Sequence, residues 1–275
     1  MYVTHPAQVF PTAIKTEMSE LAVTTRGSLV TLFVDGVESS AIDLTDPHYL
    51  EFEYMQQMRI ALNTIFGDTD PLRVLHLGGA GCAFARALDA DRPGSRQLAI
   101  ELDPKLAECA RQWFDLPRAP RLRIRAQDAR TTLDTNKGSW QVIVRDAFRR
   151  GRIPLQLATA EAHAKAANLL TADGVYLLNI AGEAGLEPMY REVAGLLQSF
   201  THLTAISDPA ILKGRRFGNI VLCAAHAPLP VAEIDHLVRR LPLPTIVVPQ
   251  SKLVSGARST LPYTDAEYLA GGTAH

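Results

Sequence analysis

Residues 72–103 read LRVLHLGGAGCAFARALDADRPGSRQLAIELD and hold one complete strand–turn–helix–strand unit. Its first six residues are an apolar run of the length expected of a buried parallel strand. Three glycines follow within four positions, and the next six residues favour a helix. A second apolar run, 97–100, then ends on Glu101 and Asp103. This order predicts a βαβ unit with a ligand-binding turn.

The glycine turn and the acid together favour a nucleoside ligand. Glycines let the backbone turn sharply and let a ligand approach without meeting a Cβ, and the following helix presents free N–H groups there. Glu101 stands 20 residues after Gly81 (101 − 81), where a carboxylate can accept both ribose hydroxyls. A tight turn without a ligand is the alternative, and the acid in this position disfavours it.

The composition is that of an ordinary globular protein. The chain has 275 residues, 47% hydrophobic and 21% charged, with a net charge of −1, enough for one large domain and an appendage. The near-zero charge argues against a nucleic-acid partner, and no apolar run reaches the roughly 18 residues of a membrane span. Three cysteines without paired spacing predict no metal site. We therefore expect a cytoplasmic, metal-free protein.

The flanking sequence predicts three regions, 1–45, 46–241 and 242–275. Residues 1–18 lack periodicity and suggest a loose arm, and Asp35-Gly36 between two β-rich runs predicts a hairpin. Asp46-Pro47 predicts the start of a helix that runs to about Phe66. Strands and helices, among them a helix over Leu155–Leu170, then alternate to residue 241, which predicts an α/β, mostly parallel, helix-covered sheet with an antiparallel edge. Little pattern follows Pro242.

Acids follow three successive predicted strands: Glu101 and Asp103, then Asp128, then Asp146. Carboxyl ends of parallel strands meet at one edge of a sheet, so these acids can converge on one crevice. Each could instead only cap the helix after it. We expect Glu101 to face the ribose, Asp128 the adenine amino group and Asp146 the reactive end.

At these positions the chain resembles the spermidine synthase (polyamine aminopropyltransferase) family, from about Leu32 to Ala225. The matching motifs are Leu77–Cys82 with Arg86, Ile100–Asp103, Gln127–Ala129, Trp140–Asp146, Phe33–Gly36, Glu51–Tyr54 and Gly218–Leu222.

The resemblance implies a Rossmann-like methyltransferase fold, with a seven-stranded sheet preceded by a small N-terminal β-hairpin lobe. It also implies a homodimer and a sulfonium donor, either decarboxylated S-adenosylmethionine or S-adenosylmethionine (AdoMet). The catalytic residues that the resemblance implies are Asp146 and Tyr54. The implied donor-binding residues are Gly78, Gly79, Ala80, Gly81, Glu101, Leu102, Asp128, Ala129 and Asp146.

Three departures from that family concern the amine site. Gly81 stands where the family's glycine loop carries an aspartate, and Arg149 stands where a second aspartate follows the catalytic one. The family's Tyr-His-Glu is here Tyr54-Met55-Gln56. Losing acids and gaining arginines removes attraction for a dicationic amine, so putrescine is expected to be a poor acceptor.

Four arginines, at 145, 149, 150 and 152, bracket Asp146, and a Lys-Gly-Arg-Arg run begins at Lys213. They are either an ordinary solvated surface or a sign of an acceptor with a carboxylate or phosphate. Alkyl transfer of the aminopropyl type, AdoMet-dependent methyl transfer and non-catalytic nucleoside binding all remain open. NAD(P) oxidoreduction is disfavoured because no later segment resembles a hydride-transfer site.

Overall fold

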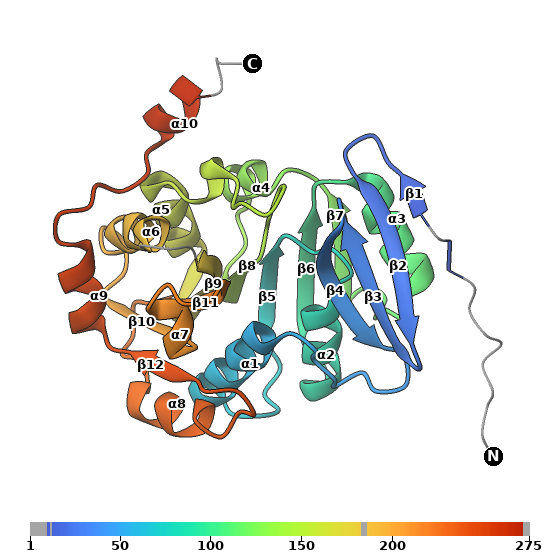
Figure 1. The fold of residues 1–275 in the computed structure, drawn as a ribbon, viewed down its shortest axis with the longest axis horizontal. Coiled ribbons are helices and arrows are strands. Elements are labelled where there is room, and N and C mark those ends of the chain that lie inside the picture. The colour runs from blue at the N-terminus through green and yellow to red at the C-terminus, as the bar shows by residue number, and fades with distance from the viewer. Residues whose placement is uncertain (1–9, 12, 183–185, 272–275) are drawn as a thin grey trace.

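The computed structural model describes residues 10–11, 13–182 and 186–271. Its larger sheet has the strand order β12-β10-β11-β9-β8-β5-β6-β7 (Figure 1). The strands are β5 (Arg73–Leu77), β6 (Arg96–Glu101), β7 (Leu122–Ala126), β8 (Trp140–Arg145), β9 (Leu170–Gly182), β10 (His202–Ser207), β11 (Gly218–Ala225) and β12 (Ile246–Val248). The five strands β5 to β9 run parallel, and β11, β10 and β12 add an antiparallel edge.

This is the predicted α/β, Rossmann-like fold with an antiparallel edge, although its sheet has eight strands where seven were expected. The eighth, β12, pairs with β10 and comes from the region after Pro242. That region also forms α9 (Gln250–Ala257) and α10 (Asp265–Gly271). The expectation of little regular structure there is wrong.

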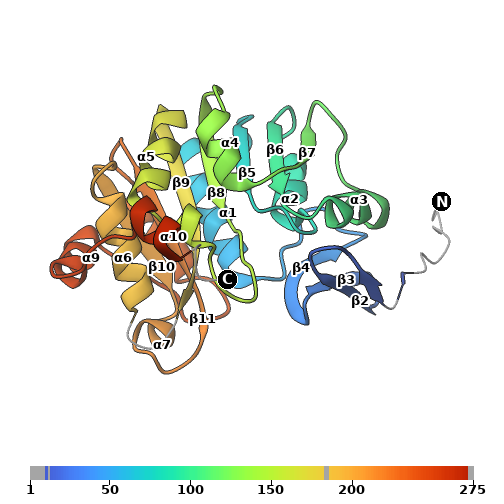
Figure 2. The ribbon, with the colours of Figure 1, turned by 90° about the horizontal axis from the view of Figure 1, so that it is seen from above.

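Helices cover both faces of the sheet (Figure 2). One face packs against α1 (Glu53–Phe66), α2 (Ala83–Asp91), α3 (Pro104–Trp113) and α8 (Val231–Val238), and the other against α4 (Ala129–Thr135), α5 (Ala160–Leu169), α6 (Glu187–Leu196) and α9. Alternate residues of β8 divide between the two cores: Val142 and Val144 face the first, and Ile143 faces the second. Shorter helices are η1 (Leu155–Leu157) and α7 (Pro209–Leu212). None of the helices in the described ranges is long and apolar enough to cross a membrane.

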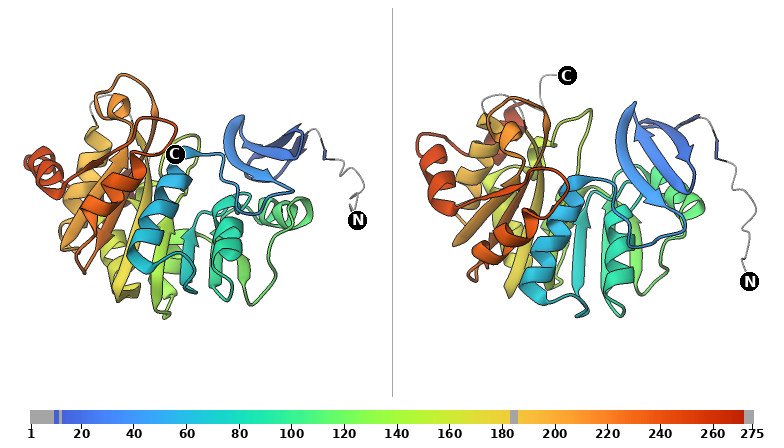
Figure 3. Two further views of the ribbon diagram at one scale, coloured as in Figure 1. Left: turned by 90° about the horizontal axis from the view of Figure 1, so that it is seen from below. Right: turned by 60° about the horizontal axis from the view of Figure 1, so that its bottom comes forward.

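The N-terminal lobe is a four-stranded antiparallel sheet beside α2 and α3 (Figure 3). Its strands are β1 (Ala13–Lys15), β2 (Glu20–Arg26), β3 (Leu29–Val34) and β4 (Val37–Asp43). The predicted hairpin turn is confirmed: Asp35 and Gly36 have φ values of 51° and 78°, as a type I′ turn requires. The expectation of a loose arm over residues 1–18 is wrong at Ala13–Lys15, because this strand pairs with β2. Residues 1–9 and 12 of the expected arm lie outside the described residues.

Two predicted helix boundaries are wrong. Helix α1 begins at Glu53 rather than after Asp46, because residues 46–52 form the crossing from the N-terminal lobe. Asp46 instead accepts the His48 amide at 2.9 Å, and buried Arg86 of α2 donates to the carbonyls of Asp43 and Asp46. The helix predicted from Leu155 to Leu170 is divided into η1 and α5, and Thr159 caps α5.

Candidate active site

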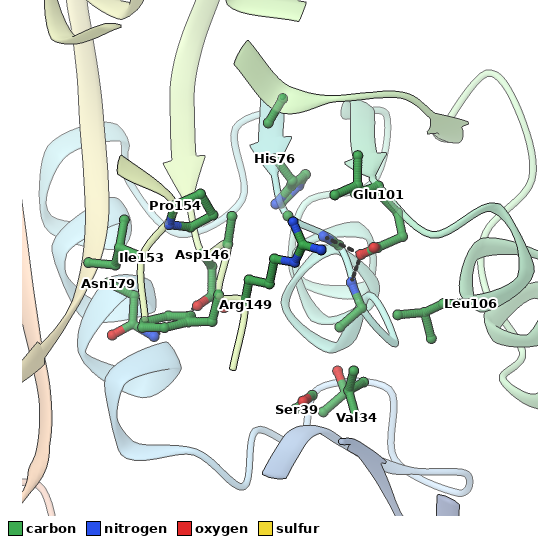
Figure 4. Close-up of a pocket in the computed structure, with 18 of the residues that line it drawn as sticks. Val34, Ser39, His76, Glu101, Leu106, Asp146, Arg149, Ile153, Pro154 and Asn179 are labelled. Carbon is green, nitrogen blue, oxygen red and sulfur yellow. Dashed lines mark hydrogen bonds between the residues drawn. The ribbon is translucent and has the colours of Figure 1, made fainter. Parts of the chain in front are cut away.

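A pocket of about 940 Å³ lies where β5, β6 and β8 end and is closed from the opposite side by the N-terminal lobe. Figure 4 shows Val34 and Ser39 of that lobe facing Glu101 and His76 across it. Among the predicted site residues that line the pocket are Tyr54, Gly78, Gly79, Ala80, Glu101, Leu102, Asp128, Ala129 and Asp146. Gly81 is absent from this lining.

The glycine loop joins three parts of the site by close packing. Gly78 has φ 93°, and a Cβ there would lie 2.3 Å from the carbonyl oxygen of Asp146, so only glycine fits. A Cβ on Gly81 would lie 2.7 Å from the Cβ of Ser40 on β4. Ser40 is 1% exposed and occupies the space that a longer side chain at position 81 would need. The N-terminal lobe therefore packs directly against the glycine loop through Ser40.

Glu101 ends β6 with its carboxylate turned towards the glycine loop. Its Oε2 accepts the amides of Ala80 at 2.9 Å and Gly79 at 3.4 Å (Figure 4). Its Oε1 accepts the amide of Asp103 at 3.0 Å. Burial raises the pKa of Glu101, and these three N–H groups oppose the rise. Carboxylate oxygens have several lone pairs, so both can still accept ribose hydroxyls.

The other strand-end acids have structural partners. Asp103 caps α3 through Oδ1, and its Oδ2 accepts the hydroxyls of Thr16 at 2.5 Å and Ser19 at 2.8 Å. It thus ties the β1–β2 turn to the end of β6. Asp128 caps α4 by accepting the amide of Thr131 at 2.8 Å and also lines the pocket. Both acids therefore cap the helix that follows them. Asp128 can do so and still contact a ligand, because it also lines the pocket.

Asp146 follows β8 and is held by two side chains. The Tyr54 hydroxyl donates to Oδ2 at 2.7 Å, and the Asn179 amide donates to Oδ1 at 2.8 Å. Asn179 is oriented in turn by Asn219, which donates to its carbonyl oxygen at 2.9 Å. Burial raises the pKa of Asp146, whereas Asn179, Tyr54 and the charge of Arg145 lower it. Burial and Asp146 raise the pKa of Tyr54 well above its usual value, so the phenol stays protonated.

Arg145 is not part of the basic surface predicted around Asp146. Its side chain is fully buried and makes a two-pronged ion pair with Glu192 of α6, where Nη2 and Oε1 are 3.0 Å apart. It also donates to the carbonyls of Leu157 and Asn179 at 3.3 Å. Because side chains alternate along a strand, the residue before Asp146 points into the second core.

Arg216 is also paired, with Asp208 at 3.3 Å and Glu53 at 3.6 Å. Of the arginines predicted around Asp146, only Arg149, Arg150 and Arg152 line the pocket, and all three are exposed. Figure 4 shows Arg149 extending between Asp146 and Glu101.

His76 and Cys82 line the pocket, but both side chains are buried. The ring of His76 bonds Gln97 at 2.9 Å, and burial lowers its pKa to about 4. Burial raises the pKa of Cys82 to about 12, which leaves an unreactive thiol. Sequence reasoning missed Asn179 and Ser40. A polar residue in the apolar run of β9 was the available signal for Asn179, but nothing in the sequence marks Ser40 as a partner of Gly81.

No family model matches the chain. A solved structure, a probable spermidine synthase from Corynebacterium glutamicum, superposes with a TM-score of 0.88 at 31% identity, covering 94% of this chain and 97% of that one. A polyamine aminopropyltransferase from Neisseria meningitidis is 27% identical over 229 residues, which is 82% of this chain and 83% of that protein. A spermidine synthase in complex with the transition-state analogue AdoDATO shares the fold at 16% identity, with a TM-score of 0.57 and coverage of 94% and 82%.

The first of these likenesses extends over nearly the whole of both chains at 31% identity. The chain belongs to the spermidine synthase (polyamine aminopropyltransferase) family of transferases.

Proposed function

We propose that this protein moves an alkyl group of the aminopropyl type from an AdoMet-derived sulfonium nucleoside to a small nucleophile. The observation that carries the proposal is the pairing of two carboxylates in one pocket. Glu101 stands beside the glycine loop, and Asp146, held by Tyr54 and Asn179, stands across from it (Figure 4). The related spermidine synthase solved with AdoDATO supports a donor of this type.

In this proposal each end of the pocket has its own task. Gly78, Gly79 and Ala80 border the donor, with Glu101 and Leu102 at the ribose. Asp128 and Ala129 take the adenine. A sulfonium donor is already activated, so positioning supplies much of the rate. Asp146 orients the nucleophile and accepts its proton, and Tyr54 fixes the carboxylate. We also propose a homodimer, for which sedimentation should give twice the 30.0 kDa chain mass.

We infer that putrescine is a poor acceptor. Gly81 has no carboxylate to offer an amine, and Ser40 fills the space beside it. Gln56, at the family's glutamate position, donates to the Leu50 carbonyl at 2.7 Å. Arg149 adds a positive charge to the pocket wall. Each difference weakens the attraction for a dication.

Methyl transfer from intact AdoMet is the second candidate. It is favoured by Gly81, because a loop without an aspartate does not repel the carboxylate that AdoMet carries and its decarboxylated form lacks.

An assay of released nucleosides tests these proposals. The protein is incubated with decarboxylated AdoMet or AdoMet and a panel of small nucleophiles that includes putrescine. We expect methylthioadenosine to form with an acceptor other than putrescine. Release of S-adenosylhomocysteine from AdoMet would assign methyl transfer instead. Efficient spermidine formation would contradict the inference about putrescine. Donor binding without turnover of any nucleophile would favour a nucleoside-binding protein.

A further inference from the structure

Residues 149–152 form a tight two-residue hairpin on the wall of the pocket. The Arg149 amide donates to the Arg152 carbonyl at 2.8 Å, and the Arg152 amide donates to the Arg149 carbonyl at 3.1 Å. Between them, Arg150 and Gly151 have φ values of 51° and 73°. Two successive positive φ values define a type I′ turn, whose twist suits a short hairpin. The backbone at this position is therefore ordered by its own hydrogen bonds.

This hairpin places like charges together. Arg149 and Arg152 are directly opposite each other across its two strands, so their side chains leave the same face. Like charges at such a pair are destabilising. Arg150 adds a third cation and holds a left-handed backbone conformation that glycine or asparagine adopts more easily. Two features therefore destabilise this hairpin: the repulsion between Arg149 and Arg152, and the left-handed backbone conformation of Arg150.

No carboxylate in the described part of the chain forms an ion pair with these three arginines. Two acids of the same pocket, Asp146 and Glu101, already have other partners. Asp146 accepts from Tyr54 and Asn179, and Glu101 accepts three backbone amides. All three arginines line the pocket, and Arg149 extends into it between Asp146 and Glu101 (Figure 4). The described residues therefore supply no carboxylate that compensates these three positive charges, and a bound ligand can supply one.

We propose that the 149–152 hairpin binds a carboxylate of a substrate held in this pocket, an inference that rests on the proposed function. The planar guanidinium of arginine matches a carboxylate with two parallel hydrogen bonds. A singly charged carboxylate suits this pocket better than a phosphate dianion, because Glu101 and Asp146 already place negative charge in it. Two substrates could supply the group: the amino-acid end of intact AdoMet, or the acceptor.

Calorimetry on the full chain distinguishes these two sources. The variants are Arg149→Gln/Arg152→Gln and, as a matched control, Lys213→Gln/Arg215→Gln, which removes two cations from the surface outside the pocket. Each protein is titrated with AdoMet, decarboxylated AdoMet and methylthioadenosine. Each protein, both free and as its methylthioadenosine complex, is then titrated with glutarate and 4-aminobutyrate. The altered residues are exposed, so we expect both variants to fold, which circular dichroism can verify.

If the donor supplies the carboxylate, the hairpin variant should bind AdoMet about tenfold more weakly, with its affinity for the other two nucleosides unchanged. If the acceptor supplies it, the affinities for all three nucleosides stay unchanged. Glutarate or 4-aminobutyrate then binds the wild-type and control complexes but not the hairpin variant. Equal binding of AdoMet and of both carboxylates by all three proteins would overturn the proposal.

Methylthioadenosine has no carboxylate, so its binding reports on the nucleoside pocket alone. Its failure to bind the wild-type protein would contradict the proposed function. The carboxylate titrations of the free proteins would then still decide whether the hairpin binds an anion.

Discussion

Asp146 has each carboxylate oxygen held by a separate element, Oδ2 by Tyr54 of α1 and Oδ1 by Asn179 of β9. A group fixed in this way can orient a nucleophile and accept a proton from it. Because burial raises the pKa of Asp146, the proton acceptor forms only above that raised pKa, and the rate should fall as the pH drops through it.

We predict that Asp146→Asn keeps donor binding and loses turnover of the true acceptor by roughly 10²- to 10⁴-fold. Asparagine preserves the size of the side chain and can still accept from Tyr54, but it cannot take a proton. Single-turnover rates with calorimetry of methylthioadenosine separate the two effects. Retained turnover with intact donor binding would make Asp146 a structural residue.

Removing one partner of the buried Arg145–Glu192 ion pair should destabilise the protein more than removing both partners. Glu192→Leu leaves the fully buried Arg145 charge alone and should lower the free energy of unfolding by about 3–5 kcal/mol. The double variant Arg145→Met/Glu192→Leu removes both charges and should recover most of that loss. Urea denaturation of the two variants measures the difference. A double variant that is no more stable than Glu192→Leu would show that the two residues do not act as a pair.

At the residue scale, sequence predicts which residue types follow each strand but not where their side chains point. Eight of the nine predicted donor-site residues line the pocket, as does Tyr54. The eight are Gly78, Gly79, Ala80, Glu101, Leu102, Asp128, Ala129 and Asp146. Arg145 was misassigned because the pleat turns it away from Asp146. The contact between Gly81 and Ser40 could not be predicted, because Ser40 comes from another lobe.

At the scale of elements, Asp103 connects the β1–β2 turn to the end of β6. The hydroxyls of Thr16 and Ser19 and two α3 amides lower its pKa, although burial alone would raise it. Because the folded pKa is depressed, the carboxylate contributes stability above its unfolded pKa, and that stability is lost as the pH falls through the folded value.

Asp103→Ala should therefore lower the free energy of unfolding at pH 7 by about 1–2 kcal/mol, as the loss of a helix cap does. The difference between variant and wild type should shrink as the pH falls below about 4, the usual unfolded pKa of aspartate. Denaturation at pH 7 and at pH 3 measures it. A difference that grows in acid would contradict the assigned hydrogen bonds.

Element boundaries follow from sequence where the signal is local. The Asp35-Gly36 hairpin and the parallel strands were predicted because turn chemistry and apolar runs act within a few residues. The start of α1 was not predicted, because Arg86, which is distant in sequence, holds the carbonyls of Asp43 and Asp46 where the chain leaves the N-terminal lobe. Strand β12 was missed because it has three residues and its partner β10 lies 39 positions earlier (246 − 207).

At the scale of the molecule, the site exists only where two lobes meet. The larger sheet supplies Glu101 and Asp146, and the N-terminal lobe covers them with Val34, Ser39 and Ser40. We propose a division of the chain into a lobe of residues 1–45, a nucleoside-binding domain of 46–241 and a C-terminal segment of 242–275. Because β12 of that segment pairs with β10 of the main sheet, removal of residues 242–275 should disturb the folding of the larger domain.

The central claim is that this pocket binds a sulfonium-type nucleoside through Glu101. Calorimetric titration of the wild-type protein and Glu101→Ala with methylthioadenosine, and with NAD for comparison, tests it most directly. A carboxylate that accepts two ribose hydroxyls contributes about 1.5–3 kcal/mol for each bond, so the variant should bind at least a hundredfold more weakly. Unchanged affinity for methylthioadenosine in Glu101→Ala, or tighter binding of NAD than of methylthioadenosine by the wild-type protein, would contradict the account.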